Sequence, residues 1–568
     1  MSKAQSSPDT DTSFPSIRRI VPIVFFGTWI LLALLISYLH WVNALYGAIL
    51  LTPILITLIL RAKEVQLRGL KFLPWRRATS LYGWSLVTWF SLMVMLYSLE
   101  LWRGKWAYAS LIRSVEESNR SLDVESLAPP LISESENFCA TPLLASLIKG
   151  NENANLILGD FREMAPSEEL DRIRSVELPD RKPRLKVTWY ANKTTNFDFW
   201  VRLFNRSTMV DRQTDDSDSA PEKILASLEP FSEILNELLE ASRSRPGSRW
   251  DLAYERGWMV EALTGARDEV LENLISVLAL RSSAYLALGK SDAAANDLYL
   301  GIRLLETVRN EPSIHTQRHH ISWLFTLFQP LWEGLATQKW SQTQLDQFKS
   351  DLEKIDLIEK SLRLRGSTAL LQMDIWNEID DAYSVQSLIT NHRVLLKQND
   401  GARFWVGLLW QLHPKGWTYQ SQVLAYRWFF PLPHSNIRNT RPTDPINTIF
   451  IVPKLKALSR DIEVRLPESH VTIQQAIIAC ALEQFRIEHG EYPEKLSELT
   501  LNKPTLLEER KTPLNDLVTY HLLPGKRYFL APPSMQNPST SITPKNYPNL
   551  IGLHNSQWDR VWRYPADL

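Results

Sequence analysis

Cysteine is almost absent from this 568-residue sequence, which contains only Cys139 and Cys480. Disulfide-rich secreted scaffolds need several cysteines at characteristic spacings, so two residues far apart in the chain define no such framework. The sequence therefore excludes a disulfide scaffold and leaves open whether the two cysteines form a single bond.

An excess of charge of either sign is also missing, because 63 Lys and Arg residues balance 63 Asp and Glu residues. A domain that binds nucleic acid normally carries a basic patch or a clearly positive net charge. Nucleic acid is therefore not an expected partner, and neither is an acidic substrate.

Local catalytic motifs are missing as well. The sequence contains no Gly-x-Ser-x-Gly, His-Glu-x-x-His or Cys-x-x-Cys pattern. Gly289, Lys290 and Ser291 resemble the end of a phosphate-binding loop, but Ala284 occupies the place of its first glycine and the flanking pattern predicts helices on both sides. We predict no catalytic residue and no cofactor.

Glu311, His315 and His319 are the candidate metal ligands, because steps of four residues place all three on one face of a helix. Pro312, however, allows a helix only to begin at that point, so Glu311 would lie at its cap. Arg318 would also oppose a bound cation. We favour a polar helix surface over a metal site here, and no metal is predicted.

Three long apolar runs near the N-terminus are the most informative feature that is present: Ile20 to Leu39, Ala44 to Leu60 and Tyr82 to Leu99. A bilayer core of about 30 Å needs about 20 apolar residues as helix, and about 17 can suffice. A cleaved signal peptide would have a shorter apolar core and would not lead directly into a second run. The runs therefore predict three transmembrane helices.

Basic residues set the expected orientation of these helices. Arg18 and Arg19 precede the first run, and six basic residues lie in the loop at residues 61–81 against a single acidic residue. Because cytoplasmic loops are enriched in Lys and Arg, the tail at residues 1–19 and this loop are expected in the cytoplasm. Residues 20–102 then form an anchor in a bacterial inner (cytoplasmic) membrane, and the bulk of the chain is expected to be periplasmic.

Residues 103–223 are expected to contain a juxtamembrane helix and a small β-containing region. Residues 186–190 and 197–204 are rich in β-branched and aromatic residues and flank a polar stretch, a pattern typical of a strand pair. The acidic run at residues 215–219 lacks the glycine and the distal glutamate of a calcium loop, and we interpret it as a linker.

Residues 224–467 have the pattern of a helical array, with few glycines and many helix-forming residues. From Ala279 to Val308, small and large apolar residues recur at helical spacing on both sides of Gly289, which predicts a pair of helices. This segment resembles a tetratricopeptide unit, whose paired helices stack in this way. An ordinary helical hairpin explains the pattern equally well, because stable repeat arrays need about three units.

Residues 468–568 are expected to form a small α+β module. Thr472 and Gln475 fit a capping box, an apolar stripe follows, and Gly490 can end the helix in a left-handed conformation, which together predict a helix over residues 472–489. Two short strands are expected near residues 518–520 and 528–530. The apolar stripe consists of Ile473, Ile477, Ile478, Ala481, Leu482 and Phe485.

The stretch from Ala481 to Pro493 resembles the segment of type II secretion pseudopilins in which a long helix leaves through a Gly-x-Tyr-Pro turn into a small sheet. The resemblance implies that the 472–489 helix packs on an antiparallel sheet. The prepilin leader and membrane helix of a pseudopilin do not lie immediately upstream of this segment, so the resemblance is to the globular module alone.

Six further stretches have unusual local sequence: residues 137–142, 284–305, 329–336, 416–420, 489–493 and 561–565. Through them the chain resembles an uncharacterised family of membrane-anchored proteins of planctomycete and verrucomicrobial type. The resemblance covers most of the soluble part and implies a membrane anchor, but it implies no activity.

The expected fold class is mainly α: three transmembrane helices, an irregular and repeat-like helical extracytoplasmic domain, and a small α+β C-terminal module. The expected function is a membrane-anchored scaffold or binding protein, with the lipid bilayer and a protein or cell-envelope component as partners. The alternative is an envelope hydrolase whose acid and base residues come from distant positions. A transporter component has little support, because the apolar runs carry no ionisable residue.

Overall fold

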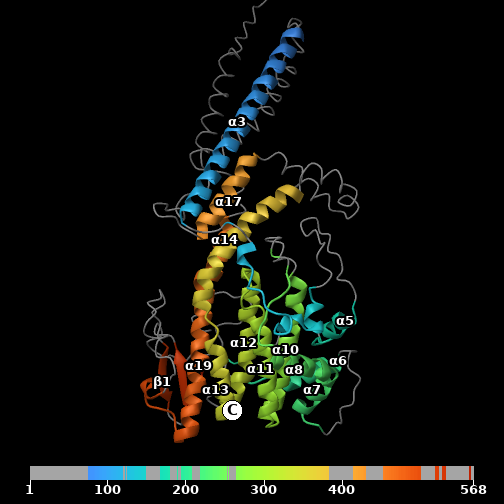
Figure 1. Ribbon diagram of the computed structural model, residues 1–568, viewed down its shortest axis with the longest axis vertical. Coiled ribbons are helices and arrows are strands. Elements are labelled where there is room, and N and C mark those ends of the chain that lie inside the picture. The colour runs from blue at the N-terminus through green and yellow to red at the C-terminus, as the bar shows by residue number, and fades with distance from the viewer. Residues whose placement is uncertain are drawn as a thin grey trace, which may run out of the picture. The chain divides into compact units, whose positions relative to one another are not determined.

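The computed structural model describes residues 75–118, 122, 125–148, 167–179, 189, 193–206, 218–252, 254, 264–382, 414–429, 452–499, 518–523, 527–531 and 562–563. Across these residues the protein is mainly helical (Figure 1). The described chain divides into two compact units. The first contains residues 75–117, 414–424 and 452–455, and the second contains the remainder.

The first unit is built on α3 (Trp75–Glu117), which packs against the first turns of α17 (Lys415–Phe429). The two backbones approach closely at Gly104 and Gly416, where a Cβ on either residue would overlap with backbone atoms of the other helix. Beside this crossing, Gln420 accepts a hydrogen bond from Arg103 (2.8 Å) and donates one to Glu100 (3.1 Å). A glycine contact and a polar bridge thus hold the helix pair together.

The core of the second unit consists of three helices that pack on one another: α10 (Gly265–Ala287), α11 (Ser291–Thr307) and α12 (Ile314–Ala336) (Figure 1). Gly289 turns α10 into α11 with a φ of +73°, a conformation that glycine adopts without steric penalty. Ala284, Ala294 and Leu304 have no exposed surface. The helical pair predicted over residues 279–308 is confirmed.

Shorter helices cover this core. α7 (Ala220–Leu228) packs on α10, α6 (Phe197–Arg206) packs on α7, and α8 (Ser232–Ser244) packs on α11. Ser219 and Glu222 form the capping box that starts α7, so the predicted linker ends there, whereas its residues 215–217 lie outside the described chain. Two further helices are α4 (Pro142–Ala145) and α5 (Glu168–Arg174).

The strand predicted over residues 197–204 is wrong, because this segment is helix α6. Trp200 and Phe204 lie four residues apart and are both buried, and Asn196 accepts a hydrogen bond from the amide three residues on (2.9 Å). The aromatic content favoured a strand, but burial of residues at helical spacing decides the conformation. The partner strand predicted at residues 186–190 lies outside the described residues except for one.

The C-terminal part of the second unit is organised around α19 (Leu466–His489), which contacts α12, α13 (Gln342–Glu353) and α14 (Leu357–Ala382). The π-helical turn η8 (Asp461–Arg465) joins it to α18 (Val452–Arg460). The capping box predicted at Thr472 and Gln475 is wrong, because both residues are buried inside a helix that begins earlier. The predicted helix end is confirmed: Gly490 has a φ of +80° and closes α19.

Three short antiparallel strands lie beside α19 in the order β1 (Thr519–Leu523), β2 (Arg527–Ala531) and β3 (Trp562–Arg563). Tyr520 pairs with Leu530, and Leu530 pairs with Trp562. Gln475 of α19 donates a hydrogen bond to the Leu530 carbonyl (3.3 Å). Because α19 also packs on helices of the second unit, an independent α+β module over residues 468–568 stays a prediction.

The apolar stripe of α19 is buried apart from its last member. Ile473, Ile477 and Leu482 are at most 5% exposed. Phe485 is only partly buried and stacks on His489, with ring centroids 4.0 Å apart. The helix therefore lies between the strands and the helices α13 and α14, rather than on a sheet alone.

One described helix, α10, is long and apolar enough to cross a membrane, and 72% of its most apolar stretch is buried inside the protein. The run predicted as the third transmembrane helix, residues 82–99, lies on α3. The first two runs lie outside the described residues. The three-helix anchor stays a prediction.

Cys139 and Cys480 are both free and buried. Burial raises the pKa of both thiols, that of Cys480 to about 12. The disulfide that the sequence left open is not formed in this structure.

Candidate ligand-binding pocket

The structure separates the three candidate metal ligands. Glu311 lies in the loop before α12 and is buried, whereas His315 is exposed in the first turn of that helix. His319 lies 3.9 Å from Glu272 of α10 and contacts the ring of Trp323 in its own helix in a tilted arrangement. Within the described residues, no group of three His, Cys, Asp or Glu side chains is placed to hold a metal ion.

Glu311 belongs to the loop at residues 308–313, which joins α11 to α12. Gln317 of α12 donates hydrogen bonds to two carbonyls of this loop, both at 2.9 Å. Ser367 of α14 donates to a third, that of Pro312 (2.7 Å). Side chains from two helices thus fix the backbone of the loop and hold Glu311 in a defined position.

A buried ion-pair cluster includes Glu311. Arg267, in the first turn of α10, has no exposed surface and pairs with Glu311 (Nη1 to Oε1, 3.1 Å) and with Asp268 (Nη2 to Oδ1, 2.7 Å). Its guanidinium lies over the Trp250 ring, 5.0 Å from the centroid. The Tyr254 hydroxyl donates to the same Glu311 oxygen (3.4 Å). Two carboxyl groups therefore face one guanidinium, in a site closed to water.

The second oxygen of Glu311, Oε2, is enclosed and accepts no hydrogen bond from any described residue. Burial raises the pKa of the Glu311 carboxyl, and the charge of Arg267 opposes that shift. A carboxyl oxygen accepts hydrogen bonds when ionised and can donate one when protonated. Oε2 is therefore a polar atom with unused hydrogen-bonding capacity.

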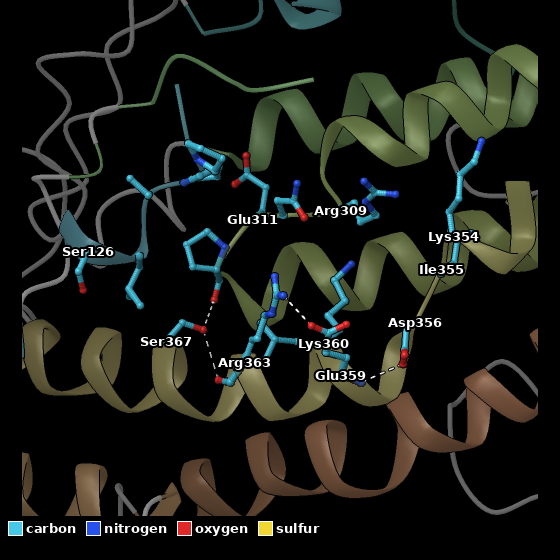
Figure 2. A pocket seen from close by; sticks show the side chains of 17 residues that line it. Ser126, Arg309, Glu311, Lys354, Ile355, Asp356, Glu359, Lys360, Arg363 and Ser367 are labelled. Atoms are coloured by element: carbon cyan, nitrogen blue, oxygen red, sulfur yellow. Dashed lines mark hydrogen bonds and ion pairs between the residues drawn. The ribbon is translucent and has the colours of Figure 1, made fainter. Parts of the chain in front are cut away.

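Glu311 lines a pocket of about 820 Å³ (Figure 2). The other walls are the turn between α13 and α14 at residues 354–356, the first turns of α14 up to Ser367, and residues 126–130. Arg249 holds the last of these walls by donating a hydrogen bond to the Pro129 carbonyl (3.0 Å). The volume lies within the range of about 300 to 1,000 Å³ that is typical of small-molecule sites.

Four basic side chains line the pocket, and two of them have close acidic partners. Arg363 pairs with Glu359 (2.6 Å), and Lys354 pairs with Asp351 (2.7 Å). Both of these basic residues are at least half exposed. Their charges are therefore screened by water and balanced at the rim.

The other two basic residues, Arg309 and Lys360, are less closely paired with acidic side chains. Arg309 lies 4.0 Å from Glu306, which also pairs with Arg303. Lys360 Nζ has almost no exposed surface and no hydrogen-bond partner among the described residues. Burial lowers the pKa of the Lys360 ammonium well below its ordinary value, Arg309 lowers it further, and Glu311 raises it. In Figure 2, Lys360 extends from α14 towards the loop that carries Arg309 and Glu311.

Such an arrangement suits the binding of an anion. An enclosed ammonium without a hydrogen-bond partner is costly, and a charge-assisted hydrogen bond to an anionic ligand removes that cost. Within the described residues, the pocket offers a basic pair and one free carboxyl oxygen, and none of these is arranged as a nucleophile with a hydrogen-bonded base.

The unusual sequence stretches have structural roles outside the pocket. In residues 329–336, Glu333 of α12 accepts hydrogen bonds from the amide (2.6 Å) and hydroxyl (2.7 Å) of Thr195. Gln329 accepts one from the amide of Trp189 (2.8 Å) and donates one to Glu333 (2.7 Å). This stretch therefore ties the chain before α6 to the core helix.

The other stretches that are described act in similar ways. Asn137 accepts a hydrogen bond from the Arg249 amide (2.9 Å) and donates one to the Arg249 carbonyl (2.7 Å). Residues 416–420 form the contact with α3. Residues 489–493 form the turn after α19, where Tyr492 donates to Glu483 (2.8 Å). These residue patterns specify packing and say nothing about chemistry.

Comparison of the chain with protein-family models, with curated proteins and with solved structures finds no match. The proposal for function therefore rests on the geometry of the chain itself.

Sequence reasoning considered Glu311 for a different role and missed Arg267, Arg309 and Lys360. Arg267 and Lys360 lie in segments with an ordinary helical pattern, in which charged residues usually face solvent. The only local signal was Pro312, which marks the loop that carries Arg309 and Glu311.

Proposed function

We propose that this protein is a membrane-anchored binding protein whose helical second unit receives a ligand in the pocket between the α11–α12 loop and α14. The observation that carries the proposal is the pocket of about 820 Å³, in which Lys360 Nζ and Glu311 Oε2 are enclosed without partners among the described residues. A buried polar group without a partner costs about 1 to 3 kcal/mol, and such groups are typically retained at functional sites.

The surface of α3 supports the membrane anchor. Large apolar side chains are exposed along this helix, and two exposed tryptophans follow, a residue type that favours membrane interfaces. Exposed apolar surface of this extent is typical of a segment that contacts lipid or another protein. The exposed residues are Val87, Phe90, Leu92, Val94, Met95, Leu99, Trp102 and Trp106.

The proposal includes the finer architecture expected from the sequence. It comprises three transmembrane helices in a bacterial inner membrane, a repeat-like helical array in the periplasm, and a pseudopilin-like module at residues 468–568. Three features support it: the six basic residues between Arg61 and Arg77, the α10–α11 pair, and the hydrogen bond from α19 to β2.

Reporter fusions test the orientation. Alkaline phosphatase, which is active only outside the cytoplasm, is fused after residue 110 and, separately, after residue 70. We expect activity only after residue 110, at equal amounts of fusion protein on an immunoblot. Activity confined to the fusion after residue 70 would contradict the proposed topology.

Photocrosslinking tests the pocket in intact cells. A photoreactive amino acid replaces Lys354 at the pocket rim, and the matched control carries the same residue in place of Glu240 of α8, which is exposed and does not line the pocket. We expect light-dependent adducts, detected by intact-mass analysis, at position 354 and not at position 240. Equal adducts at both positions, or none at 354, would argue against a ligand in this pocket.

A further inference from the structure

Two of the basic side chains that line the pocket, Lys360 and Arg309, are less closely paired than the other two, and the acidic residues Glu311, Asp356 and Glu359 line it as well. Lys360 has no hydrogen-bond partner among the described residues, and Arg309 shares Glu306 with Arg303. Glu311 is the acidic group nearest in sequence to Arg309, but its Oε1 is committed to Arg267 (3.1 Å). Lys360 therefore has unused hydrogen-bond donors, and Arg309 lines the same pocket.

We propose that the pocket binds a small organic anion through a phosphate or carboxylate group held by Lys360 and Arg309, while Glu311 Oε2 contacts a hydroxyl or amine of the same ligand. The inference rests on the proposed function, because it names the ligand class of the same pocket. Charge-assisted hydrogen bonds from lysine and arginine are the usual means by which proteins hold such groups.

The matched charges at the rim limit how many anionic groups the ligand carries. Lys354 and Arg363 are already paired with Asp351 and Glu359 at 2.7 and 2.6 Å. Lys360 and Arg309 are the two remaining basic residues of the pocket, so a ligand with one anionic group fits it better than a polyanion does. The zero net charge of the chain also gives no long-range attraction for a nucleic acid.

The proposed contact with Glu311 Oε2 requires that the ligand also carries a hydrogen-bond donor. Glu311 Oε2 is enclosed, belongs to a residue that is 4% exposed, and lies on a loop fixed by Gln317 and Ser367. A simple inorganic anion would leave this oxygen without a partner. An organic ligand with a hydrogen-bond donor beside its anionic group satisfies both sides of the pocket, and we expect it to bind more tightly than inorganic phosphate does.

Calorimetric titration of the full chain in neutral detergent tests this inference. The probes are inorganic phosphate, acetate, glycerol phosphate and glycine, of which the last two carry a donor beside the anionic group. We expect glycerol phosphate or glycine to bind more tightly than the matching simple anion. Vesicles of phosphatidylcholine with and without phosphatidic acid distinguish a lipid headgroup from a free ligand, since binding only to the anionic vesicles identifies a lipid source and overturns the small-ligand proposal.

The variants are Lys360→Met, which keeps the side-chain length and removes the charge, and Lys339→Met, which makes the same change at an exposed position after α12. We expect Lys360→Met to weaken binding of the best probe by about tenfold or more, and Lys339→Met to leave it unchanged. Equal affinity in Lys360→Met and the unchanged protein would overturn the inference. Circular dichroism of both variants establishes that they are folded.

The two proposals can fail separately. If no anion binds, but photocrosslinking at residue 354 still gives adducts, the anionic ligand class is wrong while the binding function stands. If neither experiment shows a ligand, both are wrong.

Discussion

Replacing Lys360 with methionine should stabilise the protein when no ligand is bound. The Lys360 ammonium is enclosed, has no hydrogen-bond partner among the described residues, and lies near the charge of Arg309. Methionine has nearly the same length and flexibility, so it can keep the apolar contacts of the side-chain stem without a buried polar group. Most core substitutions destabilise, so the expected sign is opposite to the general trend.

The magnitude follows from the burial of one polar group. An enclosed donor without a partner costs about 1 to 3 kcal/mol by mutational data, and the substitution removes that cost. We expect the free energy of unfolding to rise by about 1 to 3 kcal/mol, less any loss from imperfect packing of the thioether. The matched substitution of exposed Lys339 should change it by less than about 0.5 kcal/mol.

The gain should depend on pH. Because the folded state lowers the pKa of Lys360 below the ordinary value of 10.5, the unfolded chain binds more protons between the two pKa values. The stability contributed by this residue therefore rises with pH across that window and is lowest below the folded pKa. The advantage of Lys360→Met should be largest at low pH and should shrink as the pH approaches 10.5.

Denaturant unfolding in a buffer without phosphate or carboxylate, at about pH 7 and at about pH 9, measures both quantities. The reasoning is refuted if Lys360→Met lowers the free energy of unfolding by more than about 1 kcal/mol, since that would mean that the ammonium has a stabilising partner. A gain of the same size at both pH values would refute the assignment of a lowered pKa.

Three further predictions concern other parts of the chain. Gly416→Ala should weaken the α3–α17 contact by about 1 to 3 kcal/mol or more, because its Cβ would overlap with the Glu100 carbonyl. The control is Gly265→Ala, whose Cβ meets nothing within 4 Å and which should be neutral or stabilising; thermal unfolding measures both. Glu333→Ala should lower the free energy of unfolding by about 2 to 4 kcal/mol, because it leaves the Thr195 amide and hydroxyl without their acceptor. Proteolysis before α6 should become faster, and an unchanged cleavage rate would contradict this. Burial lowers the pKa of His320 well below its usual 6.5, so protonation of the unfolded chain should reduce stability as the pH falls below 6.5, and His320→Gln should flatten that part of the stability-against-pH curve.

Elements could be predicted from the sequence where the pattern that specifies them spans only one or two helical turns. The helical pair at residues 279–308 was predicted because small and large apolar residues recur every three or four positions around Gly289, and α10 and α11 lie there. The end of α19 was predicted because Gly490 is the residue type that adopts a positive φ without a steric penalty. Neither inference needs to know what the helices pack against.

Where local preference competed with packing, the tertiary structure decided. Residues 197–204 have the aromatic content of a strand, yet they form α6 because Trp200 and Phe204 are both buried at helical spacing. Thr472 is a residue type that often caps a helix. Here the π-helical turn η8 leads from α18 directly into α19, so Thr472 lies inside a helix that has already begun. Composition fixes which residues can be buried, and their neighbours in space determine the conformation in which burial is achieved.

The sequence by itself determined that the chain is largely helical, where the central helical pair turns and where the last long helix stops, because periodicity and glycine conformation are local properties. Only the tertiary structure brought Arg267, Glu311 and Lys360 into one region from three different elements. The physical reason is that the cost of a charge depends on what surrounds it. Lys360 of α14 has the sequence pattern of an ordinary solvated lysine, but the α11–α12 loop, which is distant in sequence, helps to enclose its ammonium, and this ammonium has no hydrogen-bond partner among the described residues.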